Sequence, residues 1–105
     1  MDAREAALPS DTIFLVERYW PGIDDASLDA ALRRLESASR TIGAIEHLGS
    51  LLVEVDQVVF SVMRAGSETL LREVNERAHM PVDRVAAVSP HGFEALGKEA
   101  SGEGR

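Results

Sequence analysis

The sequence predicts one α+β domain built from two successive β-α-β halves. Segments rich in β-branched and aromatic residues alternate with amphipathic segments in the order strand, helix, strand, strand, helix, strand. With 105 residues, the chain has the usual size of a single domain and can bury a modest core. It contains no cysteine, so disulfides, thiolate nucleophiles and cysteine-ligated metals are excluded.

The first strand and the first helix have clear end signals. TIFLVERY at residues 12–19 predicts a strand that ends at the Trp20-Pro21-Gly22 turn. A helix is expected to start at Asp24 and Asp25, which can accept hydrogen bonds from free amides, and to end at Gly43. Its apolar stripe recurs every three or four residues and consists of Leu28, Ala31, Leu32, Leu35, Ala38 and Ile42.

A hairpin is predicted between residues 45 and 64, with its tip at Asp56-Gln57. This register pairs Val55 with Val58, Val53 with Phe60, and Leu51 with Val62, and we expect these six residues to face the core. The opposite face is then an interface or a pocket wall, formed by Ser50, Leu52, Glu54, Val59, Ser61 and Met63.

The remaining elements complete the predicted topology. Ser67 is expected to cap a second helix that stops at Met80-Pro81, and residues 83–89 form the last strand. Right-handed crossovers in both halves give a ferredoxin-like βαββαβ sandwich, with an antiparallel four-stranded sheet in order 4-1-3-2 and two helices on one face. We expect residues 10–90 to form the domain, and residues 1–9 and 91–105 to be mobile.

The uncovered face of this sheet predicts a homodimer. Apolar residues occupy both faces of the predicted strands, so a second layer is needed over the face that the helices leave open. A second copy packed sheet to sheet, as in dimeric α+β barrels, is the simplest cover.

Charge and hydropathy narrow the range of partners. Lys and Arg number 11 against 18 Asp and Glu, a net charge of −7, which disfavours nucleic acid and anionic membranes. No segment has the length of a signal-peptide core or of a membrane span. A soluble, cytoplasmic protein is therefore expected.

Three segments of the chain have a recognisable pattern, namely FLVERYWPG at 14–22, FSVMRAGSE at 60–68 and AHMPVDRV at 78–85. Together they resemble a family of small bacterial ferredoxin-fold proteins that is labelled nickel-binding or nickel-responsive and is otherwise a domain of unknown function. The resemblance spans residues 12–88 and implies a homodimer that binds nickel or another divalent metal. The chain departs from the family pattern because Ser61 stands at the cysteine position and Leu51 at the histidine position.

The metal candidates in this chain are therefore His47 and Glu46. An imidazole nitrogen and a carboxylate oxygen together suit borderline divalent ions. No two of the three histidines have the spacing of a zinc or nickel site. We expect His79 to interact with the end of the second helix, and His91 to lie on the surface.

A polar patch of Glu17, Tyr19, Ser61 and Glu54 is the candidate ligand-binding site. Glu17 lies among apolar strand residues, where a carboxyl group gains proton affinity and can act as a general acid or base. In the alternative interpretation, Glu17 pairs with Arg18 or Arg64 at the rim of the sheet, or lines the dimer contact.

Three functions remain open on the sequence. The first is a small homodimeric ligand-binding protein without catalysis, which binds a small molecule or a divalent metal such as nickel and requires no other cofactor. The second is a cofactor-free dimeric α+β barrel enzyme of isomerase, cyclase or oxygenase type, with Glu17 as general acid or base and Tyr19 orienting the substrate. The third is a protein–protein interaction module that uses the open sheet face.

Overall fold

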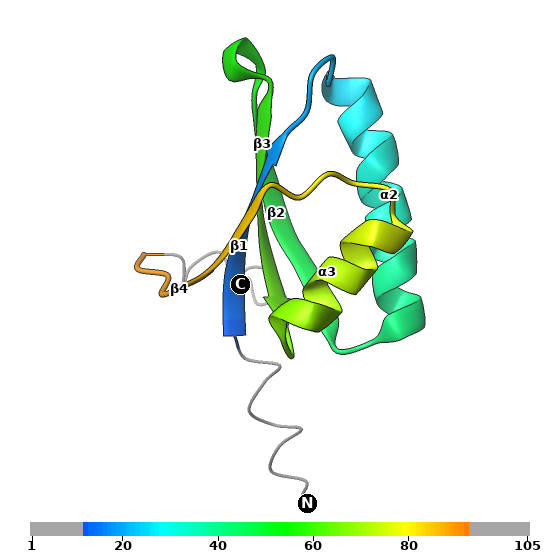
Figure 1. Ribbon diagram of the computed structural model, residues 1–105, viewed down its shortest axis with the longest axis vertical. Helices are drawn as coiled ribbons and strands as arrows, with labels where there is room; N and C mark the ends of the chain where they lie inside the picture. The colour runs from blue at the N-terminus through cyan, green and yellow to red at the C-terminus, as the bar shows by residue number, and fades with distance from the viewer. Residues whose placement is uncertain (1–11, 93–105) are drawn as a thin grey trace, which may run out of the picture.

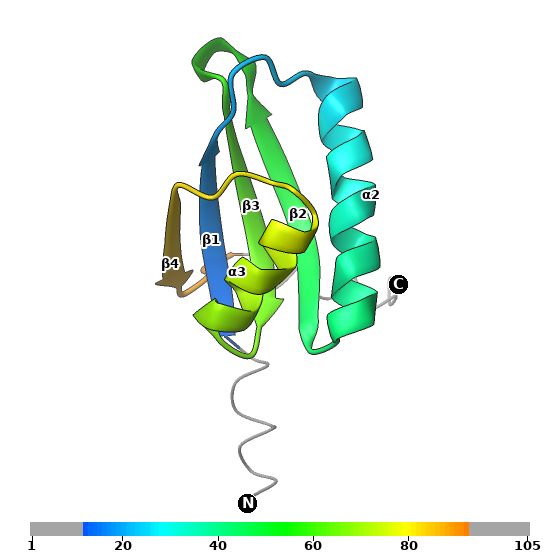
Figure 2. The ribbon, with the colours of Figure 1, turned by 45° about the vertical axis from the view of Figure 1, so that its right-hand side comes forward.

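The computed structural model describes residues 12–92, which form an open antiparallel sheet with two helices on one face (Figures 1 and 2). The predicted mobile segment 1–9 and all of 91–105 except His91 and Gly92 lie outside the described residues. The elements in chain order are β1 (Thr12–Tyr19), α2 (Asp25–Ile42), β2 (Ile45–Val53), the 3-10 helix η2 (Glu54–Asp56), β3 (Val58–Ala65), α3 (Glu68–Arg77) and β4 (Arg84–Val88).

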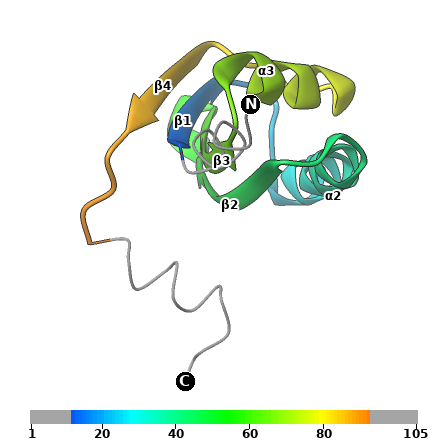
Figure 3. The same ribbon diagram turned by 90° about the horizontal axis from the view of Figure 1, so that it is seen from below.

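The strands lie in the order β2-β3-β1-β4, and every neighbouring pair is antiparallel. Seen along the strands, α2 and α3 both lie on the same side of the sheet (Figure 3). This is the ferredoxin-like α+β arrangement that the sequence predicts. In the described part of the chain, neither helix has the length and apolarity needed to cross a membrane.

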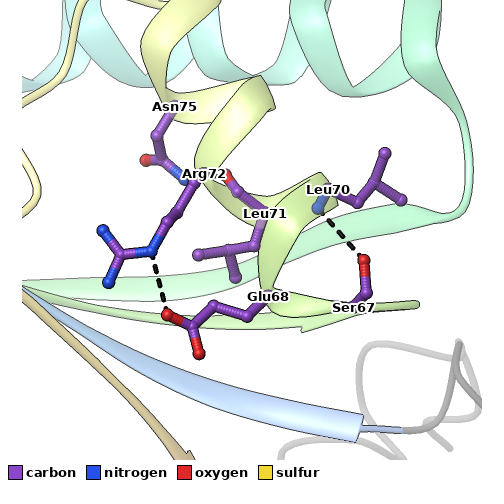
Figure 4. Close-up of polar contacts among 6 residues, drawn as sticks. All are labelled: Ser67, Glu68, Leu70, Leu71, Arg72 and Asn75. Atoms are coloured by element: carbon purple, nitrogen blue, oxygen red, sulfur yellow. Dashed lines mark hydrogen bonds and ion pairs between the residues drawn. The ribbon is translucent and has the colours of Figure 1, made fainter.

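Side-chain caps define the helix starts as expected. The Asp24 carboxylate accepts a hydrogen bond of 2.8 Å from the backbone N–H of Ser27, and this bond lowers the pKa of the carboxyl group. At the start of α3, the Ser67 hydroxyl accepts from the Leu70 N–H at 3.1 Å (Figure 4). Gly43, with φ of 82°, follows the last residue of α2.

The hairpin differs from the predicted register by two residues. Val53 pairs with Val58 instead of Phe60. The reason is the loop, because η2 and Gln57, which has φ of 56°, form a four-residue connection instead of a two-residue turn. An even shift keeps each side chain on the same face as before, so the predicted partition of residues between two faces survives.

The assignment of those faces to core and exterior was wrong. The face under the helices, which we call the covered face, is lined at the core by Phe14, Val16, Val59, Met63 and Ala65. The other, which we call the open face, carries five of the six residues predicted to be core, namely Leu51, Val53, Val58, Phe60 and Val62. The sixth, Val55, is 89% exposed in η2. Both faces of β3 are apolar enough to be buried, so alternation alone did not reveal which one the helices cover.

Candidate functional site

A row of polar side chains crosses the covered face beneath the helices. Arg18 of β1 has no exposed surface, and its Nε donates a hydrogen bond to the Ser61 hydroxyl on β3 at 3.1 Å. Ser61 is bonded to the hydroxyl of Ser50 on β2 at 2.7 Å, and Ser50 to Nε2 of His47 at 2.8 Å. The strand register aligns the two serines, because Ser50 and Ser61 are directly opposite each other in the β2–β3 pair.

Helix α3 completes this site through Asn75, which is also fully buried. Its Oδ1 accepts from Nη1 of Arg18 at 2.7 Å, and the carbonyl of Pro81 accepts from the same nitrogen at 3.0 Å. The amide of Asn75 is oriented by a second bond, from its Nδ2 to the Leu71 carbonyl at 2.7 Å. We call Arg18, Ser50, Ser61, His47 and Asn75 the Arg18 network.

Burial and a nearby charge both act on His47 at the end of the row. Burial lowers the pKa of His47, the positive charge of Arg18 lowers it further, and the Glu36 carboxylate on α2 opposes both. A pKa below 6.5 leaves the imidazole mainly neutral at pH 7, and a neutral imidazole has one donor and one acceptor nitrogen. Ser61 accepts from Arg18, and either hydroxyl of the Ser50–Ser61 pair can be the donor to the other.

Arg18 is a buried cation that lacks an anionic partner among residues 12–92. Its described acceptors are a hydroxyl, an amide oxygen and a peptide carbonyl, all of them neutral. Desolvation lowers the pKa of Arg18 to about 10, which still leaves the guanidinium charged at neutral pH. Its Nη2 is buried with no hydrogen-bond partner. Buried polar groups without a partner are rare in folded proteins.

The structure divides the four residues of the predicted ligand patch. Glu17 and Tyr19 lie on the open face, where Glu17 is paired with Arg84 at 2.7 Å and Tyr19 is 59% exposed. Ser61 lies on the covered face, and Glu54 is exposed in η2. The partner of Glu17 is thus neither Arg18 nor Arg64, because Arg18 points to the other side of the sheet.

The two metal candidates also point to opposite faces. His47 belongs to the Arg18 network, whereas Glu46 accepts from Arg64 on the open face at 2.6 Å. Within residues 12–92, no cluster of three or more His, Asp or Glu side chains could hold a metal ion. His79 follows the end of α3 with φ of 58°, and its N–H donates to the Glu76 carbonyl.

The open face has an apolar centre between charged corners. Its central residues are Leu15, Leu51, Phe60, Val62 and Ala86, of which Leu51 is 68% exposed. The pairs Glu17–Arg84 and Glu46–Arg64 lie at opposite ends of the strands and toward opposite edges of the sheet.

Sequence reasoning overlooked the central residue of the Arg18 network. The available signal was alternation, because Arg18 is in phase with Phe14 and Val16, which are both buried. Ser50, Ser61 and Asn75 carried no comparable signal, since their contacts depend on the hairpin register and on the docking of α3.

Comparison with known proteins supports the fold. No family model and no curated protein matches the chain. Among solved structures, SCO4226 from Streptomyces coelicolor A3(2) is similar, with a TM-score of 0.69 and 16% sequence identity over 76% of this chain and 99% of that one. At this identity the likeness shows the fold alone, which is the ferredoxin-like α+β sandwich.

Proposed function

We propose that the protein is a small ligand-binding protein that works as a homodimer, with the open face of one copy packed against the same face of the other. The observation that supports this proposal is the exposed apolar centre of the open face. Contiguous apolar surface that no helix of the same chain covers is typical of interaction sites. A symmetric dimer uses one patch twice, so the face needs only to complement itself.

The size of the open face suits such a dimer. The four strands contain eight, nine, eight and five residues. At about 3.3 Å per residue and about 4.8 Å between strands, their sheet has a projected area of roughly 500 Å². A side-chain surface over that area comes close to the ~800 Å² of accessible surface that each partner buries in a standard interface.

The distribution of charge also supports an interface. The ion pairs Glu17–Arg84 and Glu46–Arg64 flank an uncharged centre. Interfaces commonly have this anatomy, with charged residues depleted from the core and present at the rim. In a sheet-to-sheet dimer, these pairs would fix the relative orientation of the two copies.

We propose binding without catalysis because the candidate catalytic groups are engaged elsewhere. The Glu17 carboxylate is held by Arg84, and the Ser61 hydroxyl lies under the helices in contact with Arg18 and Ser50. A general acid or base must reach a proton on the substrate. Neither group has such a position in the single chain.

Sedimentation velocity of the full chain tests the dimer. We expect the wild type to sediment as a dimer at micromolar concentration, and Leu51→Lys to raise the dissociation constant at least about thirtyfold, because disrupting an interface anchor costs about 2 kcal/mol or more. Val55→Lys is the matched control, since Val55 is exposed but lies in η2, outside the open face. A monomeric wild type at high micromolar concentration would contradict the proposal.

The divalent metal that the family resemblance implies is a separate part of the proposal. Nickel at His47 would have to replace Ser50 at Nε2, or bind at the other ring nitrogen. Calorimetric titration of wild type and His47→Gln with nickel, cobalt and zinc tests it. Saturable heat that disappears in the variant is the expected result if His47 is a ligand, and no heat in the wild type would reject metal binding.

A further inference from the structure

We propose that the Arg18 network binds a small oxyanion, of carboxylate or inorganic phosphate type, at Nη2 of Arg18. This inference rests on the proposed ligand-binding function and specifies the chemical class of the ligand. The proposed site comprises Nη2 of the Arg18 guanidinium and the hydroxyl of Ser61, and it lies between α3 and the covered face of the sheet.

The charge of Arg18 is uncompensated among the described residues. Arg18 has no exposed surface, remains charged at neutral pH and contacts only neutral acceptors. A buried charge is normally paired, because removal from water is unfavourable unless an opposite charge compensates for it. No carboxylate of residues 12–92 supplies that charge, so we infer that an anion from solution supplies it.

The hydrogen bonds of the Arg18 guanidinium leave Nη2 without an acceptor. Of the five N–H groups of Arg18, one donates to Ser61 and two are directed at Asn75 and Pro81. The two remaining hydrogens are both on Nη2, which is buried without a partner. Because Nη2 shares an edge of the guanidinium plane with Nε, an acceptor bound there would lie beside the Ser61 hydroxyl. Planar guanidinium edges of this kind match the oxygens of carboxylates and phosphates.

The guanidinium of Arg18 is already held in position by its neighbours. Asn75 and the Pro81 carbonyl fix the far side of the guanidinium, and the second bond of Asn75 to Leu71 fixes the amide. A binding group that is pre-positioned loses little entropy when the ligand arrives. Because Arg18 is fully covered, the anion must be small, and its entry requires local opening of the layer between α3 and the sheet.

The chemistry of the network favours an anion over a metal cation. The guanidinium charge would repel a divalent ion, whereas Ser61 and Ser50 can turn their hydroxyl protons toward an oxyanion. His47 stands at the far end of the row, where its Nε2 is bonded to the Ser50 hydroxyl and does not contact Arg18.

The thermal unfolding midpoint of the full chain, titrated with sodium formate, acetate or phosphate, tests this inference. Sodium chloride keeps the ionic strength constant, and the three anions distinguish planar carboxylates from tetrahedral phosphate. We expect a saturable rise in the midpoint for the wild type, and at least about tenfold weaker apparent affinity in Ser61→Ala, since a hydrogen bond to a charged group is lost. Arg33→Gln is the matched control and should respond like the wild type, because Arg33 is exposed on α2, outside the Arg18 network and the open face.

Two results would overturn the inference. One is the absence of any saturable rise with the three anions, which would mean that Nη2 is satisfied by water. The other is an equal rise in wild type, Ser61→Ala and Arg18→Met, which would mean a general salt effect; if Arg18→Met does not fold, Ser61→Ala decides. Sedimentation of the same samples separates this inference from the dimer, since a dimer without anion response rejects only the anion site, and an anion-binding monomer rejects only the dimer.

Discussion

The two faces of the sheet combine apolar and polar side chains in different ways. The covered face contains a buried arginine, two serines and a half-buried histidine, whereas the open face has Leu51, Phe60 and Val62 at its centre. Burial is therefore decided by what packs on a face and by whether its polar groups find partners. On the covered face almost every one does, with Nη2 of Arg18 as the exception.

This contrast also suggests different roles for the two faces. Polar side chains that bond to one another within the core hold α3 in a defined position on the sheet, through Arg18 and Asn75. No helix of the same chain buries the apolar open face. The hydrophobic free energy of burying this face can therefore be gained on association. Substitutions on the two faces should therefore affect different measurements.

The largest expected effect is the loss of a covered-face side chain. Met63→Ala should lower the free energy of unfolding by about 2–5 kcal/mol, because it leaves a cavity at a fully buried position. Chemical denaturation in the Leu51→Lys background, which we expect to be monomeric, measures this without a contribution from association. The neighbouring Val62→Ala on the open face is the control, and an equal loss there would remove the energetic distinction between the faces.

The next effect concerns the connection between Arg18 and α3. Asn75→Ala should lower the free energy of unfolding by about 1.5–3 kcal/mol. The substitution removes a hydrogen bond to a buried charged group, and Nη1 of Arg18 loses one of its two acceptors. Glu76→Ala changes an exposed position on the same helix, and its free energy of unfolding should stay within about 0.5 kcal/mol of the wild-type value. Similar denaturation midpoints for the two variants would show that the bond to Arg18 is not important for stability.

The free energy of unfolding should depend on pH through His47. The folded state lowers its pKa below the unfolded value of 6.5, so the unfolded chain binds the proton more readily. The contribution of His47 to stability is therefore complete above 6.5, and it is lost as pH falls through the lower folded pKa. Arg18 from β1 and Glu36 from α2 act on the imidazole in opposite directions.

Unfolding free energies measured at about pH 7.5 and about pH 5.5 test this sign, because a depressed histidine pKa lowers stability in acid. His47→Gln should show a smaller difference between the two conditions than the wild type. An unchanged or larger difference in the variant would assign the acid sensitivity to other groups.

The smallest effect is expected at the corner of the open face. Glu17→Gln should lower the free energy of unfolding by only about 0.2–1 kcal/mol, because the Glu17 and Arg84 side chains are 33% and 61% exposed. A double-mutant cycle with Arg84→Gln isolates their coupling. A coupling above about 2 kcal/mol would exceed the range for exposed pairs, and would place Glu17 in a dry environment such as a dimer contact.

Local signals were sufficient for most of the fold. Strand β1 and the Asp24 and Ser67 caps follow from residues that are close together in sequence, and the order of the strands in the sheet follows from the right-handed crossovers of the two β-α-β halves. The loop at Gln57 was different, because a left-handed glutamine that closes a four-residue connection resembles an ordinary turn in the sequence. The candidate site was less predictable still, since Glu17 and Ser61 were expected on one face and lie on two.

Three properties could be predicted from the amino-acid sequence: which segments are helices and strands, their order along the chain, and which residues share a side of the hairpin. Those properties depend on periodicity and capping, which act over a few residues. The side that the helices cover, and thereby the burial of Arg18 beside Ser61 and Asn75, became known only from the folded arrangement. The reason is physical: these partners are 43 and 57 residues away along the chain, and alternation defines two faces without specifying which one the helices will meet.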